Sequence, residues 1–114
     1  MKGFPGRKNK YHARKTIADG IVFDSAAESR RWMELKMLQR AGMITGLTRQ
    51  VPFELVPSQK GAKETYRPVT YRADFVYYED GKMVVEDVKG CKTDVYEIKK
   101  KLMLFLRGIE IREV

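Results

Sequence analysis

The chain has one cysteine and one histidine among its 114 residues, Cys91 and His12. A single cysteine excludes an internal disulfide, which suits a reducing compartment. One cysteine and one histidine also cannot supply the ligands of a structural zinc site. No run of 18 apolar residues is present, so no membrane-spanning helix is expected. The basic N-terminal stretch is not followed by an apolar segment, so we expect no signal peptide either.

Acidic residues are few relative to basic ones: 15 Asp and Glu stand against 23 Lys and Arg, a formal net charge of +8. Such an excess favours a polyanionic partner, most often nucleic acid, although a merely basic soluble protein would share it. The length predicts one small domain. Its 43% of hydrophobic residues supports a modest core. Reactive groups are therefore expected on an open face that a polymer can reach.

Residues 1–15 contain no acidic residue. We predict that they form a flexible basic arm and that residues 16–114 form one folded domain. Gly3, Pro5 and Gly6 make a packed start unfavourable. Such an arm can follow a phosphate backbone, although a disordered solubilising terminus would have the same composition. Its candidate DNA contacts are Lys8, Lys10, Arg14 and Lys15.

Two helices are predicted from capping signals and apolar spacing. Ser25 can cap the first, over residues 26–41, and Glu28 stands three residues further on, as a capping box requires. The second helix is predicted to begin with Asp94 as its cap and to end at Gly108. Its predicted buried face consists of Val95, Ile98, Leu102 and Phe105.

Strands are predicted where residues alternate between turn signals. The predicted elements are a hairpin at 16–23, strands at 50–57, 67–78, 82–89 and 109–114, and a polar loop at 58–65. The turn between the two middle strands contains Asp80-Gly81, a strong hairpin signal. The order helix, three strands, helix, strand indicates an α/β protein with a central mixed sheet flanked by two helices.

The strongest functional signal lies between Tyr71 and Gly90. Asp74 stands within an apolar and aromatic strand, where a carboxylate costs free energy unless it is paired or bound to metal. Asp87 and Lys89 share one face of the next strand because side chains alternate. Counted outward from the turn, Asp74 and Asp87 lie at similar heights. Two converging carboxylates suit Mg²⁺, although an ordinary salt bridge with Lys89 is the simpler alternative.

These residue types suggest a mechanism. The carbonyl of Val88 could complete a metal site, and the Lys89 ammonium could orient an attacking water or stabilise charge on a phosphate. Glu28 is a further candidate ligand, although its capping box alone would explain it. Glu86 is expected to face the opposite side of the strand from Asp87, and a register slip of one residue would exchange the two.

Three more residues are candidate DNA contacts. Lys92 follows the end of a predicted strand, and Lys99 lies on a helix face that is otherwise expected to be solvated. Gln50 stands at the start of a predicted central strand and could point at the reacting phosphate. A solvent-facing position is the alternative for each of them.

Four motifs extend over most of the chain: Phe23–Glu28, Tyr71–Phe75, Val85–Gly90 and Tyr96–Lys101. With Glu28 on a helix, Asp74 on a strand and Asp87-x-Lys89 on the next, the chain resembles the PD-(D/E)XK nuclease superfamily. That superfamily includes restriction endonucleases and Holliday-junction resolvases. The longer motifs are similar to those of its small phage and prophage proteins. Ala73 stands where the superfamily name has proline.

The resemblance implies an αβββαβ restriction-endonuclease-like core and DNA cleavage that depends on Mg²⁺, with Mn²⁺ as a substitute. By motif position, the metal ligands would be Glu28, Asp74, Asp87 and the Val88 carbonyl. Lys89 would be the catalytic lysine beside the three carboxylates.

The leading hypothesis is a structure-selective endonuclease that cuts branched DNA, such as a Holliday junction, as a homodimer. By resemblance, its context would be phage or prophage recombination or DNA processing in the cytoplasm of a bacterial host. The alternatives are a flap, nicking or less selective nuclease, and a non-catalytic basic DNA-binding module. RNA is a further substrate that charge alone does not exclude.

Overall fold

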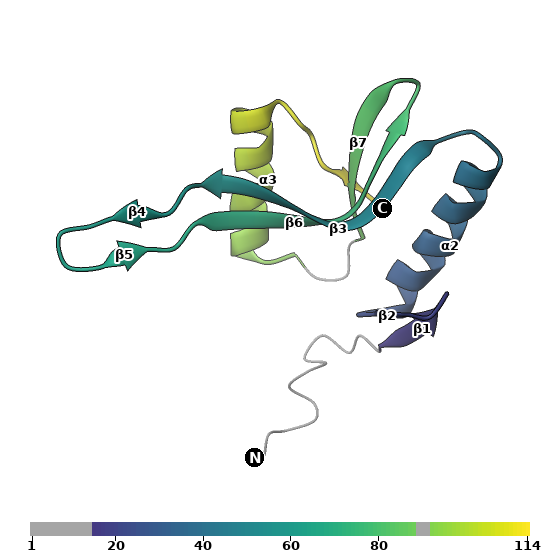
Figure 1. The fold of residues 1–114 in the computed structure, drawn as a ribbon, viewed down its shortest axis with the longest axis horizontal. Coiled ribbons are helices and arrows are strands. Elements are labelled where there is room, and N and C mark those ends of the chain that lie inside the picture. Colours follow the sequence, from purple (N-terminus) through teal and green to yellow (C-terminus); the bar gives the residue numbers. More distant parts are fainter. Residues whose placement is uncertain (1–14, 89–91) are drawn as a thin grey trace, which may run out of the picture.

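The computed structural model describes residues 15–88 and 92–114, and its centre is a four-stranded mixed sheet in the order β3-β6-β7-β8 (Figure 1). The first three strands pair antiparallel and β8 pairs parallel to β7. The strands are β3 (Thr45–Val56), β6 (Val69–Glu79), β7 (Lys82–Asp87) and β8 (Arg112–Glu113), and the helices are α2 (Ala26–Arg40) and α3 (Asp94–Arg107). The predicted α/β class and mixed central sheet are therefore confirmed.

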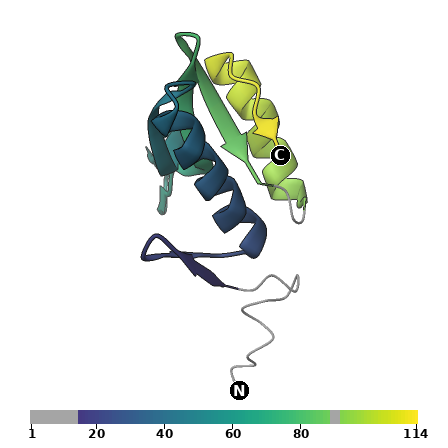
Figure 2. The ribbon, with the colours of Figure 1, turned by 90° about the vertical axis from the view of Figure 1, so that its right-hand side faces the viewer.

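The two helices cover opposite faces of the sheet, with β7 between them (Figure 2). The adjacent residues Val84 and Val85 point to opposite faces, and each belongs to a different apolar core. The core on the α2 side contains Phe23, Trp32, Leu35, Ile44, Phe75, Tyr77 and Val84. The core on the α3 side contains Leu55, Tyr71, Ala73, Val76, Val85, Met103 and Ile111. Each large side chain buried there stabilises the fold by roughly 1.5–3 kcal/mol.

Two short hairpins accompany the main sheet. β1 (Thr16–Ala18) and β2 (Ile21–Phe23) form the predicted hairpin around Asp19-Gly20. The Trp32 indole N–H donates to Asp19 Oδ2 at 3.1 Å, which ties this hairpin to α2. β4 (Gln59–Lys60) and β5 (Thr65–Tyr66) form a second hairpin where a loop was predicted. That prediction was wrong because the segment's polar composition resembles a loop although its backbone continues to pair.

Helix α2 begins as its capping box predicted. Ser25 Oγ accepts from the Glu28 backbone N–H at 3.1 Å, and Glu28 Oε1 accepts from the backbone N–H of Asp24 at 3.2 Å. The reciprocal bond therefore reaches one residue before the cap. Both bonds satisfy backbone donors at the start of the helix region that would otherwise lack partners.

Helix α3 corrects two predictions. Its N-cap is Thr93 rather than Asp94, because Thr93 Oγ1 accepts from the Tyr96 backbone N–H at 3.1 Å. Its end at Gly108, with φ 67°, is confirmed. The predicted buried face was wrong: its members Val95, Ile98 and Phe105 are exposed, Phe105 by 83%, and Leu102 is partly buried. Residues 102–106 are all apolar, so periodicity alone did not identify Met103 as the buried residue.

Strand ends also differ from the predictions. β3 begins five positions before the predicted start at residue 50 and lies at the edge of the sheet rather than at its centre. The β6–β7 turn is as predicted, with Glu79 paired to Lys82. The last strand is limited to two residues. Within the described residues, no helix has the length and apolarity needed to cross a membrane.

Candidate active site

Asp74 and Asp87 lie opposite each other on neighbouring strands. The adjacent registered pair is Phe75 with Glu86, so the antiparallel register places Asp74 across from Asp87. The two carboxyl groups are close enough to interact directly. Asp87 is 9% exposed, and Asp74 is partly buried. The prediction that these carboxylates stand at one level is confirmed.

Glu28 joins this pair through Gln50. The Gln50 side-chain Nε2 donates to Glu28 Oε2 at 3.2 Å and lies 3.4 Å from Asp74 Oδ1. Glu28 is buried, and its other oxygen, Oε1, caps the start of α2. The two roles considered for Glu28 are therefore compatible, since one oxygen serves the helix and the other faces the site.

Gln50 has a left-handed backbone, with φ 54°, in the middle of β3. A residue other than glycine in this region costs about 1–3 kcal/mol. The flanking pairs Arg49–Phe75 and Val51–Ala73 place Gln50 opposite Asp74. Strained backbone of this kind is concentrated at functional sites, which makes Gln50 part of the candidate site.

Near Asp74, the side chains of β6 pass from one apolar core to the other. Tyr71 and Ala73 pack in the core on the α3 side, whereas Phe75 and Tyr77 pack in the core on the α2 side. Regular alternation would place all four side chains on one face. Asp74 is thus located at the point where β6 passes from one core to the other, which is why a carboxylate there stays partly accessible.

The electrostatics of the site favour a bound cation or proton. Burial raises the pKa of the Asp74 carboxyl, and the nearby Glu28 carboxyl raises it further. Two contacts act in the opposite direction: the interaction with Asp87 and the Val88 backbone N–H, which donates to Asp74 Oδ2 at 2.8 Å. Three acidic side chains in a partly buried place are unfavourable unless positive charge neutralises them.

Tyr71 adds a second indication of a ligand. Its side chain is only 4% exposed, and its hydroxyl lies close to Asp87 without forming a hydrogen bond of normal geometry to any residue in 15–88 or 92–114. Burial raises the pKa of this phenol, and the charges of Asp87 and Asp74 raise it further. A buried hydroxyl without a partner costs about 1–3 kcal/mol. Its position beside two carboxylates suits a water or ligand atom that would accept its hydrogen bond.

The oxygen-rich set formed by Asp74, Asp87 and Glu28 matches the ligands that Mg²⁺ prefers. Within the described ranges, however, no group of three or more acidic, histidine or cysteine side chains is already arranged to hold a metal ion. The Gln50 amide nitrogen explains part of this difference, because it lies between Glu28 and Asp74. The donor chemistry therefore fits the cation, provided that the amide turns away when the cation binds.

A cleft of about 480 Å³ opens beside Asp87. Its lining residues are Thr70, Tyr71, Arg72, Asp87, Thr93, Val95, Tyr96 and Lys99. Arg72 is exposed, and its Nη1 donates to the Gln50 carbonyl at 3.3 Å. The cleft therefore combines a carboxylate with two cationic side chains, Arg72 and Lys99, as a phosphate-bearing substrate would require.

Glu86 faces away from this site, as predicted. Its side chain is fully buried on the α2 side, where Arg31 Nε and Nη2 donate to its two oxygens at 2.9 and 2.6 Å. The Tyr77 hydroxyl also donates to Glu86. Burial, followed by the hydrogen bond to Glu86, raises the pKa of Tyr77 to about 12. Glu86 is therefore a structural acid, and Asp87 is the one that faces the cleft.

The sequence matches one protein family over residues 8–111. The chain belongs to DUF1064, a protein family of unknown function. No curated protein matches the sequence. The match includes all four candidate catalytic residues and ends just before β8, and it assigns no activity.

The candidate DNA contacts predicted from the sequence lie in different environments. Lys15 forms an ion pair with Asp24 at 3.2 Å, and Lys92 forms one with Glu113 at 3.2 Å, so both have protein partners. Lys99 lines the cleft, and the half-buried Gln50 contacts the carboxylates of Glu28 and Asp74. Four predicted residues lie outside the described ranges: Lys8, Lys10, Arg14 and Lys89.

Glu113, at the end of β8, contacts three polar side chains near the cleft: Lys92, Tyr96 and Lys100. Its Oε2 accepts from the Tyr96 hydroxyl at 2.6 Å and pairs with Lys100 at 3.1 Å. These contacts, together with the ion pair to Lys92, lower the pKa of Glu113 to about 2. These contacts attach the first half of α3 to β8. They therefore fix the position of Tyr96, which lines the cleft.

Sequence reasoning missed Tyr71 and Arg72 as site residues. Both precede Asp74 on the same strand, and Tyr71 belongs to the Tyr-x-Ala-Asp motif. A buried tyrosine three residues before a candidate ligand resembles ordinary core packing. Only the lack of a partner for its hydroxyl and the closeness of Asp87 distinguish it.

Proposed function

We propose that this protein is a metal-dependent DNA endonuclease that hydrolyses phosphodiester bonds. The observation that carries the proposal is the facing pair Asp74 and Asp87, joined by Glu28 through Gln50, at a cleft with cationic walls. The formal charge of +8 favours a polyanionic substrate. The resemblance to PD-(D/E)XK nucleases assigns the same acidic residues to metal binding.

In this mechanism Asp74, Asp87 and Glu28 would hold Mg²⁺, with the Val88 carbonyl as an additional oxygen ligand and Mn²⁺ as a substitute. Bound there, the cation would lower the pKa of a water and stabilise charge on the scissile phosphate. The cleft side chains Arg72 and Lys99 would hold the phosphate by charge. Tyr71 would donate its unused hydrogen bond to a ligand oxygen. Lys89 keeps its sequence-based role as the lysine that orients the attacking water.

We further propose branched DNA, such as a Holliday junction, as the substrate, in phage or prophage recombination or DNA processing within bacterial cytoplasm. The support is the small size and net positive charge of the chain, together with an acidic site that lies on the central four-stranded sheet. A flap or nicking nuclease is the second candidate. A basic DNA-binding module without catalysis is the third.

Cleavage of a labelled four-way junction and of a matched linear duplex tests this proposal. With Mg²⁺, the wild-type protein is expected to cut the junction and leave the duplex largely intact, and EDTA is expected to stop cutting. Lys89→Ala should bind the junction and fail to cut it. Arg30→Ala removes an exposed cation of α2 and is the matched control, which should cut normally.

Other outcomes separate the candidates. Equal cutting of both DNAs would remove the structure-selective part and leave a less selective nuclease. Cutting that continues in EDTA, or in Lys89→Ala, would contradict the metal-dependent mechanism. Tight binding without cutting under any metal would support the non-catalytic module.

Symmetric cutting of a junction requires two active sites, so we propose a two-fold homodimer. The exposed apolar side chains of Ile98 and Phe105 on α3 are its candidate interface. Exposed apolar patches of this kind often mark protein contacts. A second copy would remove these side chains from water.

Phe105→Glu is expected to weaken the dimer at least about 100-fold, because a two-fold interface loses two buried aromatic side chains worth roughly 1.5–3 kcal/mol each. Sedimentation velocity over a concentration series measures the effect. Met37→Glu, on an exposed apolar residue of α2, is the control and should leave the dimer intact. A wild-type protein that stays monomeric at every concentration would contradict the dimer.

A further inference from the structure

The segment between β3 and β6 extends away from the two helices as a narrow two-stranded ribbon (Figure 1). We define the ribbon as residues 57–69, which include β4 and β5. Every residue in it is exposed, and β4 and β5 form a sheet of their own, separate from the central one. An isolated two-stranded hairpin adds little stability by itself. The ribbon therefore requires an explanation other than core packing.

The ribbon is nevertheless an ordered element. Gln59 pairs with Tyr66 and Lys60 pairs with Thr65. At its tip, the Gly61 backbone N–H donates to the Glu64 carbonyl at 2.7 Å. A Cβ added to Gly61 would lie 2.5 Å from Tyr66 Cε2, so the tyrosine ring covers the bare glycine backbone. This aromatic cover over a glycine holds a hairpin in register without help from a core.

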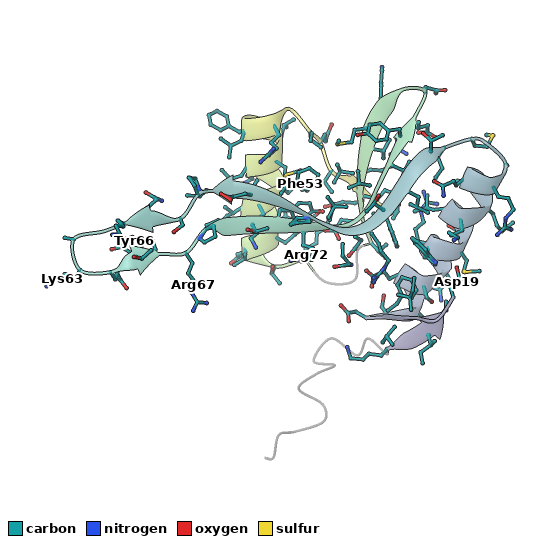
Figure 3. All side chains as sticks on the ribbon, in the orientation of Figure 1. Asp19, Phe53, Lys63, Tyr66, Arg67 and Arg72 are labelled. Carbon is teal, nitrogen blue, oxygen red and sulfur yellow. The ribbon has the colours of Figure 1, made fainter. Side chains whose placement is uncertain are left out.

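Charge is distributed unevenly on the ribbon. Alternation and the pairing register place Lys60 and Arg67 on one face, together with Thr65. Glu64, the ribbon's only acidic residue, lies on the opposite face with Tyr66. Lys63 stands at the tip, and Figure 3 shows Arg67 projecting from the ribbon and Arg72 lying nearer the centre of the molecule. One face is therefore basic and free of carboxylates.

The basic side chains of the ribbon are not engaged in ion pairs. Within the part of the chain that the structure describes, Lys60, Lys63 and Arg67 make none. Among the other described lysines, Lys15, Lys36, Lys92 and Lys100 pair with carboxylates, whereas Lys82, Lys99 and Lys101 form no ion pair. What distinguishes the ribbon is that its cations share one projecting hairpin. Three cations without ion pairs on a projecting hairpin are suited to an external polyanion.

The base of the ribbon leads to the candidate active site. β6 continues from the ribbon through Thr70 and Arg72, which line the same cleft as Asp87. A duplex that contacts the ribbon could therefore reach the cleft along β6. A two-stranded ribbon has dimensions that fit the major groove of B-form DNA, whereas the major groove of A-form RNA is too deep and narrow for side chains to read.

We propose that the ribbon of residues 57–69 is a DNA-binding element that enters the major groove of duplex DNA beside the cut site, with Lys60, Lys63 and Arg67 on its phosphates. The assignment of its ligand rests on the proposed function, because it names DNA as the substrate. Its test measures binding and cleavage separately, so that the two proposals can fail independently.

The experiment measures binding of the full chain to a fluorescent DNA duplex and to an RNA duplex of the same sequence, in EDTA, over a salt series. The test variant is Lys60→Ala/Lys63→Ala/Arg67→Ala. The control variant Arg40→Ala/Lys82→Ala/Lys101→Ala removes the same charge from exposed cations outside the ribbon. Because all six positions are exposed, the fold should persist, and circular dichroism checks this.

We expect the ribbon variant to raise the DNA Kd about tenfold or more. It should also lower the steepness of log K against log salt by roughly 2.7, which is about 0.9 for each of three lost phosphate contacts. The control should change both quantities much less, and the RNA duplex should bind more weakly than DNA. Equal losses in the two variants, unchanged affinity in the ribbon variant, or equal binding of RNA would overturn the proposal.

Cleavage separates this result from the proposed function. A wild-type protein that cuts DNA while the ribbon variant binds normally would overturn the ribbon proposal and leave the nuclease intact. A wild-type protein that binds through the ribbon and cuts nothing would support the ribbon and contradict the nuclease. A wild-type protein that binds no nucleic acid would overturn both.

Discussion

Asp74→Asn is expected to abolish binding of Mg²⁺ and Mn²⁺ and to reduce DNA cleavage by roughly 10³-fold or more. Metal-ion catalysis contributes several kcal/mol to barrier lowering, and each 1.36 kcal/mol is about tenfold in rate. Asp74 contacts Asp87, Gln50 and the Val88 N–H, so no other acid occupies so central a position in the site. Isothermal titration with each cation and the junction-cleavage assay measure the two effects.

The same substitution should not unfold the protein. A neutral side chain removes the unfavourable burial of a charge and the repulsion from Glu28, so the free energy of unfolding without metal should stay equal or increase slightly. Asp80→Asn is the matched control, because Asp80 is exposed in the β6–β7 turn with φ 52°, a conformation that asparagine tolerates. Unchanged titration heat in Asp74→Asn would show that the ligand assignment is wrong.

Arg31→Met is expected to lower the free energy of unfolding by about 3–5 kcal/mol, since it leaves a buried carboxylate without its cation. The Glu86 side chain is fully buried, and Arg31 binds both of its oxygens. The hydrogen bond with Glu86 raises the pKa of Arg31, so the guanidinium keeps its charge in the folded state. Urea denaturation followed by circular dichroism measures the loss.

Arg30→Met is the control for this prediction because Arg30 is the exposed neighbour of Arg31 on α2. It should change stability by less than about 0.5 kcal/mol. The double variant Arg31→Met/Glu86→Gln should recover part of the loss, since the amide carries no charge and can still accept from Tyr77. Equal stability of Arg30→Met and Arg31→Met would mean that the buried ion pair adds nothing.

Local rules predicted much of the fold. The Ser25 capping box and the Gly108 stop involve groups only a few residues apart, so their sequence signals survive any tertiary arrangement. The Asp80-Gly81 turn sets the β6–β7 register, and that register alone places Asp74 opposite Asp87. The same register sends Glu86 to the other face, as predicted.

Long-range contacts account for what was missed. Gln50 and Glu28 are 22 positions apart in the sequence, and Arg31 and Glu86 are 55 positions apart. Helix and strand periodicity predicts contacts only between residues a few positions apart, so it did not indicate these pairs. The buried face of α3 depends on how the helix is oriented against the sheet. In the structure Met103 is buried, although it lies within a run of apolar residues. The β4–β5 ribbon was mistaken for a loop because its exposed strands lack an apolar face.

By itself the sequence determined the α/β class, the capped start of α2, the end of α3 at Gly108 and the level of the two aspartates, because caps, turns and alternation act through neighbouring residues. The tertiary structure decided that Gln50 joins Glu28 to Asp74, that Tyr71 faces Asp87 with an unused hydroxyl, and that the ribbon extends outward from the core. These features depend on how β3, β6 and the two helices pack together, and packing brings together residues whose separation along the chain carries no local signal.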